Sequence, residues 1–147
     1  MTAESLRFLH SADLHLELPI QEIVEAPPSM VQRLSALSSR LLQRLIEIAV
    51  SEEVQFVLLA GDVMDWRRAG PALCEEWIAF CETLAEQGIP VIHVASAAER
   101  AGPMPASLVP QGVVYLSGER PRTTDWALAN GTRVVFVDWP EDAAGPD

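Results

Sequence analysis

The chain has 147 residues, 49% of them apolar, which is enough to bury the core of one domain spanning residues 1–147. It carries 21 acidic residues, 10 arginines and no lysine, for a formal net charge of −11. The arginines are scattered along the sequence, so nucleic acid binding by this chain alone is not expected. No stretch approaches the roughly 18 apolar residues of a membrane span, and no secretory leader pattern opens the chain, so we expect a cytoplasmic protein that does not enter a membrane.

The first part of the chain predicts a strand, a long helix and a second strand. Residues 6–10 form a short apolar run typical of a strand, and residues 16–29, with three prolines, are typical of a loop. Apolar residues then recur at spacings of three and four, which predicts a helix over residues 30–52 with Ser29 as its cap. Residues 54–60 are almost all apolar, as in a strand that is covered on both faces.

A second helix is predicted from Pro71 to about Gln87, where Gly88 ends it. This helix contains both cysteines of the chain, Cys74 and Cys81. Two helical turns separate them by about 10 Å along the axis, which is too far for a disulfide. We expect both to be reduced residues that pack in or near the core.

The remaining strands complete an α/β fold. They are predicted at residues 89–95, 113–116 and 133–138, and residues 124–129 are the hairpin partner of the last one. Strands that alternate with helices form a mostly parallel sheet flanked by helices, and the C-terminal hairpin adds an antiparallel pair. In such sheets ligands bind beyond the carboxyl ends of the strands.

Polar residues follow the first two strands at that edge. Asp13 and His15 come after the first strand, and Asp62 comes after the second. Two carboxylates and an imidazole suit Mn²⁺, Fe²⁺ or Zn²⁺. Two structural readings stay open, since residues 13–18 alternate as a half-exposed strand does, and Gly61-Asp62 can be a turn that caps the next segment.

The motifs FLHSADLHL and FVLLAGDVMD, joined by a long helix, resemble the N-terminal half of the calcineurin-like metallophosphoesterases, in particular the SbcD-type nuclease subunit of DNA repair complexes. The likeness runs from residue 6 to about residue 138. It implies that Asp13 and His15 bind a first metal and that Asp62 bridges to a second. Asp65 corresponds to a position that is often acidic in the family but is not usually a ligand, and we expect it to be a solvated turn residue. We expect His10, which lies within the strand, to be packed or hydrogen-bonded rather than a ligand.

The third motif of the family is degenerate in this chain. The family has Gly-Asn-His followed by an acid, in which the Asn binds the second metal and the His acts as general acid or stabilises the transition state. The corresponding residues here are Ser96, Ala97, Ala98 and Glu99. A methyl group can neither bind a metal nor donate a proton. We expect His93, which lies within the preceding strand, to pack in the core rather than to replace the missing histidine.

The family also supplies three histidines from its C-terminal half, whereas no histidine follows His93 in these 147 residues. Three ligands, Asp13, His15 and Asp62, are too few to close a two-metal site. The expected cofactor is therefore at most one weakly held divalent ion, either Mn²⁺, Fe²⁺ or Zn²⁺.

Three functions are compatible with this pattern. The first is a non-catalytic or regulatory homologue of the SbcD-like enzymes. The second is a metal-dependent phosphodiesterase or nuclease that a partner or a second copy completes, and the third is a protein interaction module. One sheet face is expected to need a cover, either from the hairpin or from a second copy or protein partner. Candidate residues for that surface are Trp126, Phe136 and Trp139, and the reading of these three as ordinary core residues stays open.

Overall fold

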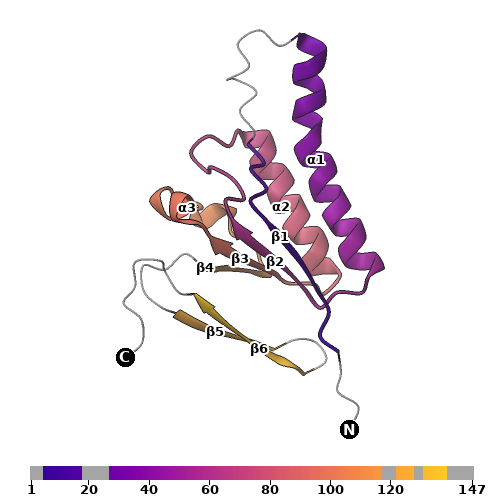
Figure 1. The fold of residues 1–147 in the computed structure, drawn as a ribbon, viewed down its shortest axis with the longest axis vertical. Helices are drawn as coiled ribbons and strands as arrows, with labels where there is room; N and C mark the ends of the chain where they lie inside the picture. The colour runs from indigo at the N-terminus through magenta and orange to yellow at the C-terminus, as the bar shows by residue number, and fades with distance from the viewer. Residues whose placement is uncertain (1–4, 18–26, 117–121, 128–130, 139–147) are drawn as a thin grey trace.

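The computed structural model describes residues 5–17, 27–116, 122–127 and 131–138 (Figure 1). A four-stranded parallel sheet in the order β1-β2-β3-β4 forms its centre, and a separate antiparallel pair is formed by β5 and β6. The strands are β1 (Phe8–Ala12), β2 (Phe56–Gly61), β3 (Val91–Ala95), β4 (Val113–Leu116), β5 (Arg122–Ala127) and β6 (Arg133–Asp138). The predicted α/β class with a C-terminal hairpin is confirmed.

The helices are α1 (Pro28–Ser51), α2 (Pro71–Glu86) and the short α3 (Ala97–Ala101), with a 3₁₀ turn at Ala106–Leu108. Figure 1 shows α1 and α2 on one side of the sheet and the hairpin on the other. The main core lies between the sheet and the two long helices. It includes the fully buried residues Val57, Leu59, Trp77, Phe80 and Leu84.

Proline sets the start of both long helices. Pro28 and Pro71 occupy the first helical position, where a missing N–H removes no hydrogen bond. Ser29 lies inside the first turn of α1, and the residue at the cap is Pro27. The prediction that Ser29 caps this helix is therefore wrong. None of the helices in the described residues is long and apolar enough to cross a membrane.

The first three strands begin about two residues later than the apolar runs predict, whereas β4 and β6 begin as predicted and β5 begins two residues earlier than the predicted range 124–129. Val54 and Ile89 are buried, but their N–H groups bond to the carbonyls of Ala49 and Leu84 in the preceding helix ends. These residues therefore belong to helix-to-strand connections. The sheet starts only where a neighbouring strand is available, as in the pairing of Phe8 with Phe56.

The hairpin covers the second face of the sheet. Trp126 and Phe136 pack with Phe56, Ile92 and Leu116 in a second apolar cluster. The rings of Phe56 and Phe136 meet edge to face, with centroids 5.6 Å apart. The hairpin therefore covers this part of the sheet, and both aromatic residues are partly buried against it. Trp139, the third candidate, lies outside the described residues.

The cysteines are free, as predicted. Cys81 is buried and Cys74 is half-buried in α2. Burial raises the pKa of the Cys81 thiol, and the neighbouring charge of Glu82 raises it further. Cys81 is therefore a small core residue.

Candidate functional site

The parallel pairing of β1 and β2 brings the first two motifs to one edge of the sheet. The register runs from Phe8 opposite Phe56 to Ala12 opposite Ala60. The backbone pairing continues past the strands, since the Asp13 N–H bonds to the Ala60 carbonyl at 3.0 Å and the His15 N–H to the Asp62 carbonyl at 3.1 Å. The carboxyl ends of the two strands therefore present their polar residues side by side.

Asp13 and His15 do not continue the strand. Both adopt left-handed backbone conformations, with φ of 51° and 46°. Such values are uncommon for residues other than glycine, although Asp, Asn and His tolerate them best. The alternative reading of residues 13–18 as a half-exposed strand is wrong for these positions, because both residues have left-handed rather than extended backbone angles.

The side chain of Asp13 contacts the second motif directly. Its Oδ1 accepts a hydrogen bond from the Asp62 N–H at 3.0 Å. Gly61 makes this approach possible, because a Cβ at Gly61 would collide with the Asp13 carboxylate. Gly61 also has φ of 76°, which glycine adopts without strain. The glycine of the second motif is thus required by the aspartate of the first.

His15 lies near the other end of Asp62. Its Nδ1 is 3.7 Å from Asp62 Oδ2, and the two side chains are 48% and 26% exposed. The structure therefore brings all three predicted metal-binding residues, Asp13, His15 and Asp62, to one place. Within the described ranges, however, no three His, Cys, Asp or Glu side chains are arranged to hold a metal ion. The contacts form a chain through Asp62 rather than a closed cage.

The end of β3 carries a helix cap at the degenerate third motif. Ser96 is the N-cap of α3, and its Oγ accepts a hydrogen bond from the Glu99 N–H at 3.1 Å. In return, Glu99 Oε2 accepts one from the Ser96 N–H at 3.2 Å. This reciprocal pair is a capping box, and the Ser-x-x-Glu spacing in the sequence is its signal. The sequence analysis did not predict this short helix.

Glu99 is a buried acid with four hydrogen-bond partners. Besides Ser96, its Oε1 accepts from the N–H groups of Val63 and Met64, each at 3.2 Å. Its Oε2 also lies 3.0 Å from His93 Nε2. A buried carboxylate is tolerated when donors surround it in this way. Glu99 therefore ties the segment that follows Asp62 to the end of β3.

His93 is fully buried, as predicted for a core residue. Its ring packs between aromatic neighbours, with centroid distances of 5.0 Å to Tyr115 and 5.9 Å to Trp77. The hydrogen bond to Glu99 adds a polar role that the sequence analysis missed. His10 is different, because it is exposed on the edge strand β1, and the expectation that it packs is wrong. Alternate side chains of β1 face outward at this edge.

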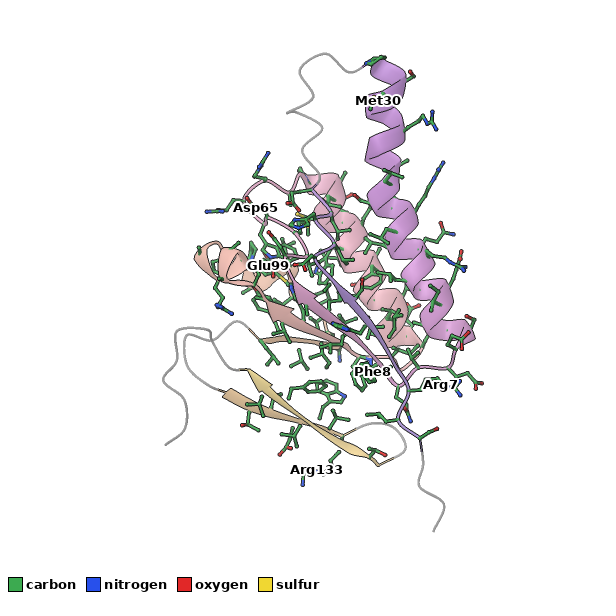
Figure 2. All side chains as sticks on the ribbon, viewed as in Figure 1. Arg7, Phe8, Met30, Asp65, Glu99 and Arg133 are labelled. Carbon is green, nitrogen blue, oxygen red and sulfur yellow. The ribbon has the colours of Figure 1, made fainter. Side chains whose placement is uncertain are left out.

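A small cavity joins the second and third motifs. It has a volume of about 40 Å³, and it is lined by Asp62, Asp65, Arg67, Ala98, Glu99 and Gly102. Ala98 therefore faces the same space as Asp62. Figure 2 shows Asp65 and Glu99 close to each other at this end of the sheet.

Asp65 is a turn residue, as expected from the sequence. Its Oδ1 accepts hydrogen bonds from the backbone N–H and the side-chain Nε of Arg67, each at 3.1 Å. The bond from the Arg67 side chain is the largest reason why the pKa of the Asp65 carboxyl lies below its usual value. Asp65 thus fixes the Arg67 guanidinium beside the cavity.

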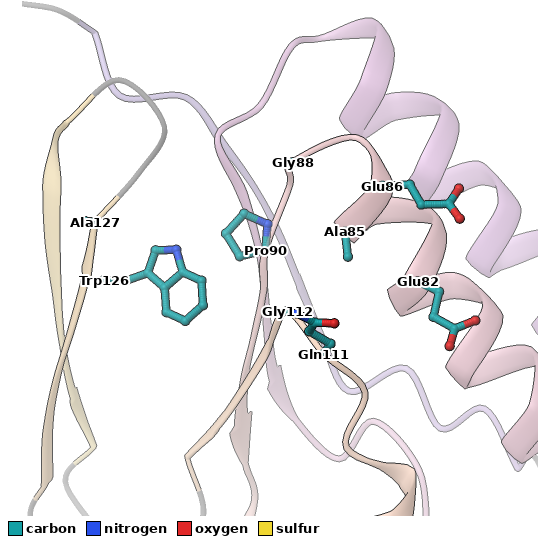
Figure 3. A pocket seen from close by; sticks show the side chains of 9 residues that line it. All are labelled: Glu82, Ala85, Glu86, Gly88, Pro90, Gln111, Gly112, Trp126 and Ala127. Carbon is teal, nitrogen blue, oxygen red and sulfur yellow. The ribbon is translucent and has the colours of Figure 1, made fainter.

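A larger cavity lies at the opposite end of the strands. It has a volume of about 740 Å³ and separates the hairpin from the end of α2 and the starts of β3 and β4. In Figure 3 the Trp126 indole points across it toward Pro90, and the carboxylates of Glu82 and Glu86 point away from the indole. This space is remote from the carboxyl ends of the strands and takes no part in the candidate site.

Part of the sequence is similar to a known protein. The sequence matches no family model. It is 40% identical over 60 residues to the uncharacterized metallophosphoesterase YhaO of Bacillus subtilis (strain 168). The match covers 41% of this chain and 15% of YhaO, so the chain spans only a small part of that protein. The chain is therefore a partial metallophosphoesterase homologue, which supports the general family that the first two motifs indicate.

Proposed function

We propose that this chain is a non-catalytic or regulatory homologue of the SbcD-like metallophosphoesterases, which does not hydrolyse phosphoesters by itself. The observation that carries the proposal is the methyl group of Ala98 in the cavity beside Asp62. The family resemblance puts the general acid at this position. General acid–base catalysis contributes roughly 10² to 10⁴ in rate, so its loss removes most of the expected activity.

The neighbouring polar groups do not replace the missing imidazole. The Glu99 carboxylate is buried and already accepts hydrogen bonds from three backbone N–H groups. His93 is fully buried against the far side of that carboxylate. The Arg67 guanidinium is held by Asp65, and an arginine keeps its proton at any pH at which the protein is folded. These contacts favour structural roles for all three.

We extend the proposal to at most one weakly held divalent ion. Asp13, His15 and Asp62 have the ligand types that suit Mn²⁺, Fe²⁺ or Zn²⁺, and a bound ion would supply Lewis-acid polarisation of a phosphoryl oxygen. In the structure, Asp13 Oδ1 instead accepts the Asp62 N–H, and the His15 ring is 3.7 Å from the Asp62 carboxylate. These side chains would have to turn to converge, which weakens binding.

A chromogenic phosphodiester assay with saturating Mn²⁺ tests the proposal. The assay compares three proteins: the unaltered chain, Asp62→Asn, and the matched control Asp125→Asn on the hairpin. We expect all three to stay at the background rate. The proposal would be overturned if the unaltered chain and Asp125→Asn hydrolysed the phosphodiester and Asp62→Asn did not. That result would favour the alternative, a metal-dependent phosphodiesterase or nuclease that a second copy or a partner completes.

A further inference from the structure

Three arginines of this acidic chain lie on one side of α1, and one of them, Arg44, is paired with Glu47. Residues 27–46 contain Arg33, Arg40 and Arg44 and no acidic residue, although the whole chain carries 21. All three arginines are exposed. They are seven and four residues apart in the sequence, and residues at these separations lie on the same side of a helix. The helix therefore concentrates positive charge that the sequence analysis described as scattered.

Apolar side chains share this side of α1. Met30 and Leu37 are each 44% exposed. With Arg33 and Arg40 they follow spacings of three, four and three residues, which is the repeat of a helix surface that faces another helix. The opposite side of α1 packs on the protein through the buried residues Leu42, Leu45 and Ala49.

A groove follows the same residues. It has a volume of about 430 Å³ and is lined by Ser29, Met30, Arg33, Leu37 and Arg40. Figure 1 shows that the first turns of α1 extend past the sheet, and Figure 2 places Met30 at this projecting end. We call Met30, Arg33, Leu37 and Arg40 the α1 stripe.

We propose that the α1 stripe binds an amphipathic helix of a partner protein, with acidic residues opposite Arg33 and Arg40 and apolar residues opposite Met30 and Leu37. Charge complementarity selects this occupant. A second copy of α1 would present the same arginines, so like charges would face each other. A nucleic acid would leave the two apolar side chains without apolar partners, and the net charge of −11 would repel it. The inference is independent of the metal site.

Fluorescence anisotropy with the full chain tests this proposal. The probe is a labelled synthetic helix of three heptads, in which Leu and Glu alternate along the series of a and d positions. The control peptide has Lys in place of every Glu. We expect the chain to bind the acidic peptide in a salt-dependent manner. We expect the double variant Arg33→Glu/Arg40→Glu to bind it at least about tenfold more weakly, because attraction becomes repulsion.

A matched double variant controls for the change in net charge. Arg7→Glu/Arg133→Glu reverses the same number of charges at the opposite end of the molecule (Figure 2) and should keep the original affinity. Leu37→Ser should weaken binding about fivefold without a change in charge. Circular dichroism establishes that each variant is folded.

Three results would overturn the proposal. The first is no binding of the acidic peptide by the unaltered chain, and the second is equal binding of the acidic and basic peptides. The third is that a short DNA duplex binds more tightly than the acidic peptide and that the duplex no longer binds to Arg33→Glu/Arg40→Glu. That result would show that the α1 stripe binds nucleic acid instead.

Discussion

The Glu99 carboxylate and the His93 imidazole are hydrogen bonded at 3.0 Å, and both side chains are fully buried. Three backbone N–H groups also point at this carboxylate. A carboxylate only accepts, so His93 donates from Nε2, and its buried Nδ1 makes no hydrogen bond within the described residues. The pair therefore joins the segment after Asp62 to the end of β3 through the protein interior.

Removing this carboxylate should destabilise the fold strongly. In Glu99→Ala, the N–H groups of Val63, Met64 and Ser96 lose their buried acceptor, and we expect a loss of about 3 to 5 kcal/mol in the free energy of unfolding. Urea denaturation measures this loss. The control Glu47→Ala breaks an exposed pair with Arg44 and should cost about 0.5 kcal/mol or less. Equal costs for the two variants would contradict the role of Glu99.

Alanine substitutions at two glycines with similar backbone angles distinguish the cost of backbone strain from the cost of a steric clash. Gly61 and Gly88 have φ of 76° and 71°, but a Cβ at Gly88 meets no atom within 4 Å. Gly88→Ala should therefore cost about 1 to 2 kcal/mol from the left-handed backbone alone. Gly61→Ala should cost about 1.5 kcal/mol more, because it also displaces the Asp13 carboxylate from the Asp62 N–H. Similar unfolding midpoints would show that Asp13 does not need this contact.

The hairpin should depend on its inward side chains. Phe136 packs against Phe56, whereas the neighbouring Val135 is 54% exposed. We expect Phe136→Ala to lower the free energy of unfolding by about 2 kcal/mol and Val135→Ala to change it by about 0.5 kcal/mol or less. Thermal unfolding followed by circular dichroism tests this difference. If Phe136→Ala were harmless, the hairpin would not be the cover of this sheet face.

Asp65 should contribute a small, pH-dependent stability. The bonded Arg67 holds the pKa of Asp65 below its ordinary value of 3.8, so the ionised form is favoured in the folded protein. This contribution is present above pH 3.8 and is lost as the pH falls through the folded-state pKa. We expect Asp65→Asn to cost less than about 1 kcal/mol at neutral pH and nothing in strong acid. A difference in urea midpoint that stays constant with pH would contradict this linkage.

The two thiols should differ in reactivity. Burial raises the pKa of Cys81, so little thiolate is available there, whereas Cys74 is partly exposed. At mildly alkaline pH, a thiol-specific reagent should label Cys74 in the folded chain and Cys81 only after unfolding. Cys74→Ser should remove the fast phase. Rapid labelling of Cys81 in that variant would show that α2 opens readily.

The sequence was sufficient to predict the parallel sheet and the proximity of the first two motifs. Apolar runs mark buried strands, and the parallel order then places Asp13 and Asp62 at one edge. The strand starts could not be predicted, because Val54 and Ile89 are as apolar as strand residues although they bond to helix ends. The left-handed turns at Asp13 and His15 depend on long-range contacts with β2, which a local pattern does not contain.

The third motif shows a second limit of prediction from the sequence. The Ser96–Glu99 spacing predicts a capping box by itself, whereas the family resemblance indicates only the metal ligand and the proton donor that Ala97 and Ala98 lack. The additional bonds of Glu99 to Val63, Met64 and His93 arise from tertiary packing of α3 against β3 and the loop that follows β2. Local sequence rules identify one partner of Glu99 and cannot identify the other three.

Counting the Mn²⁺ ions bound per chain tests the central claim most directly. The claim is that Asp13, His15 and Asp62 form at most half of a two-metal centre. Equilibrium dialysis against increasing Mn²⁺ should give no more than one ion per chain, bound weakly and lost in Asp62→Asn. Two tightly bound ions per chain, both lost in Asp62→Asn, would contradict the account.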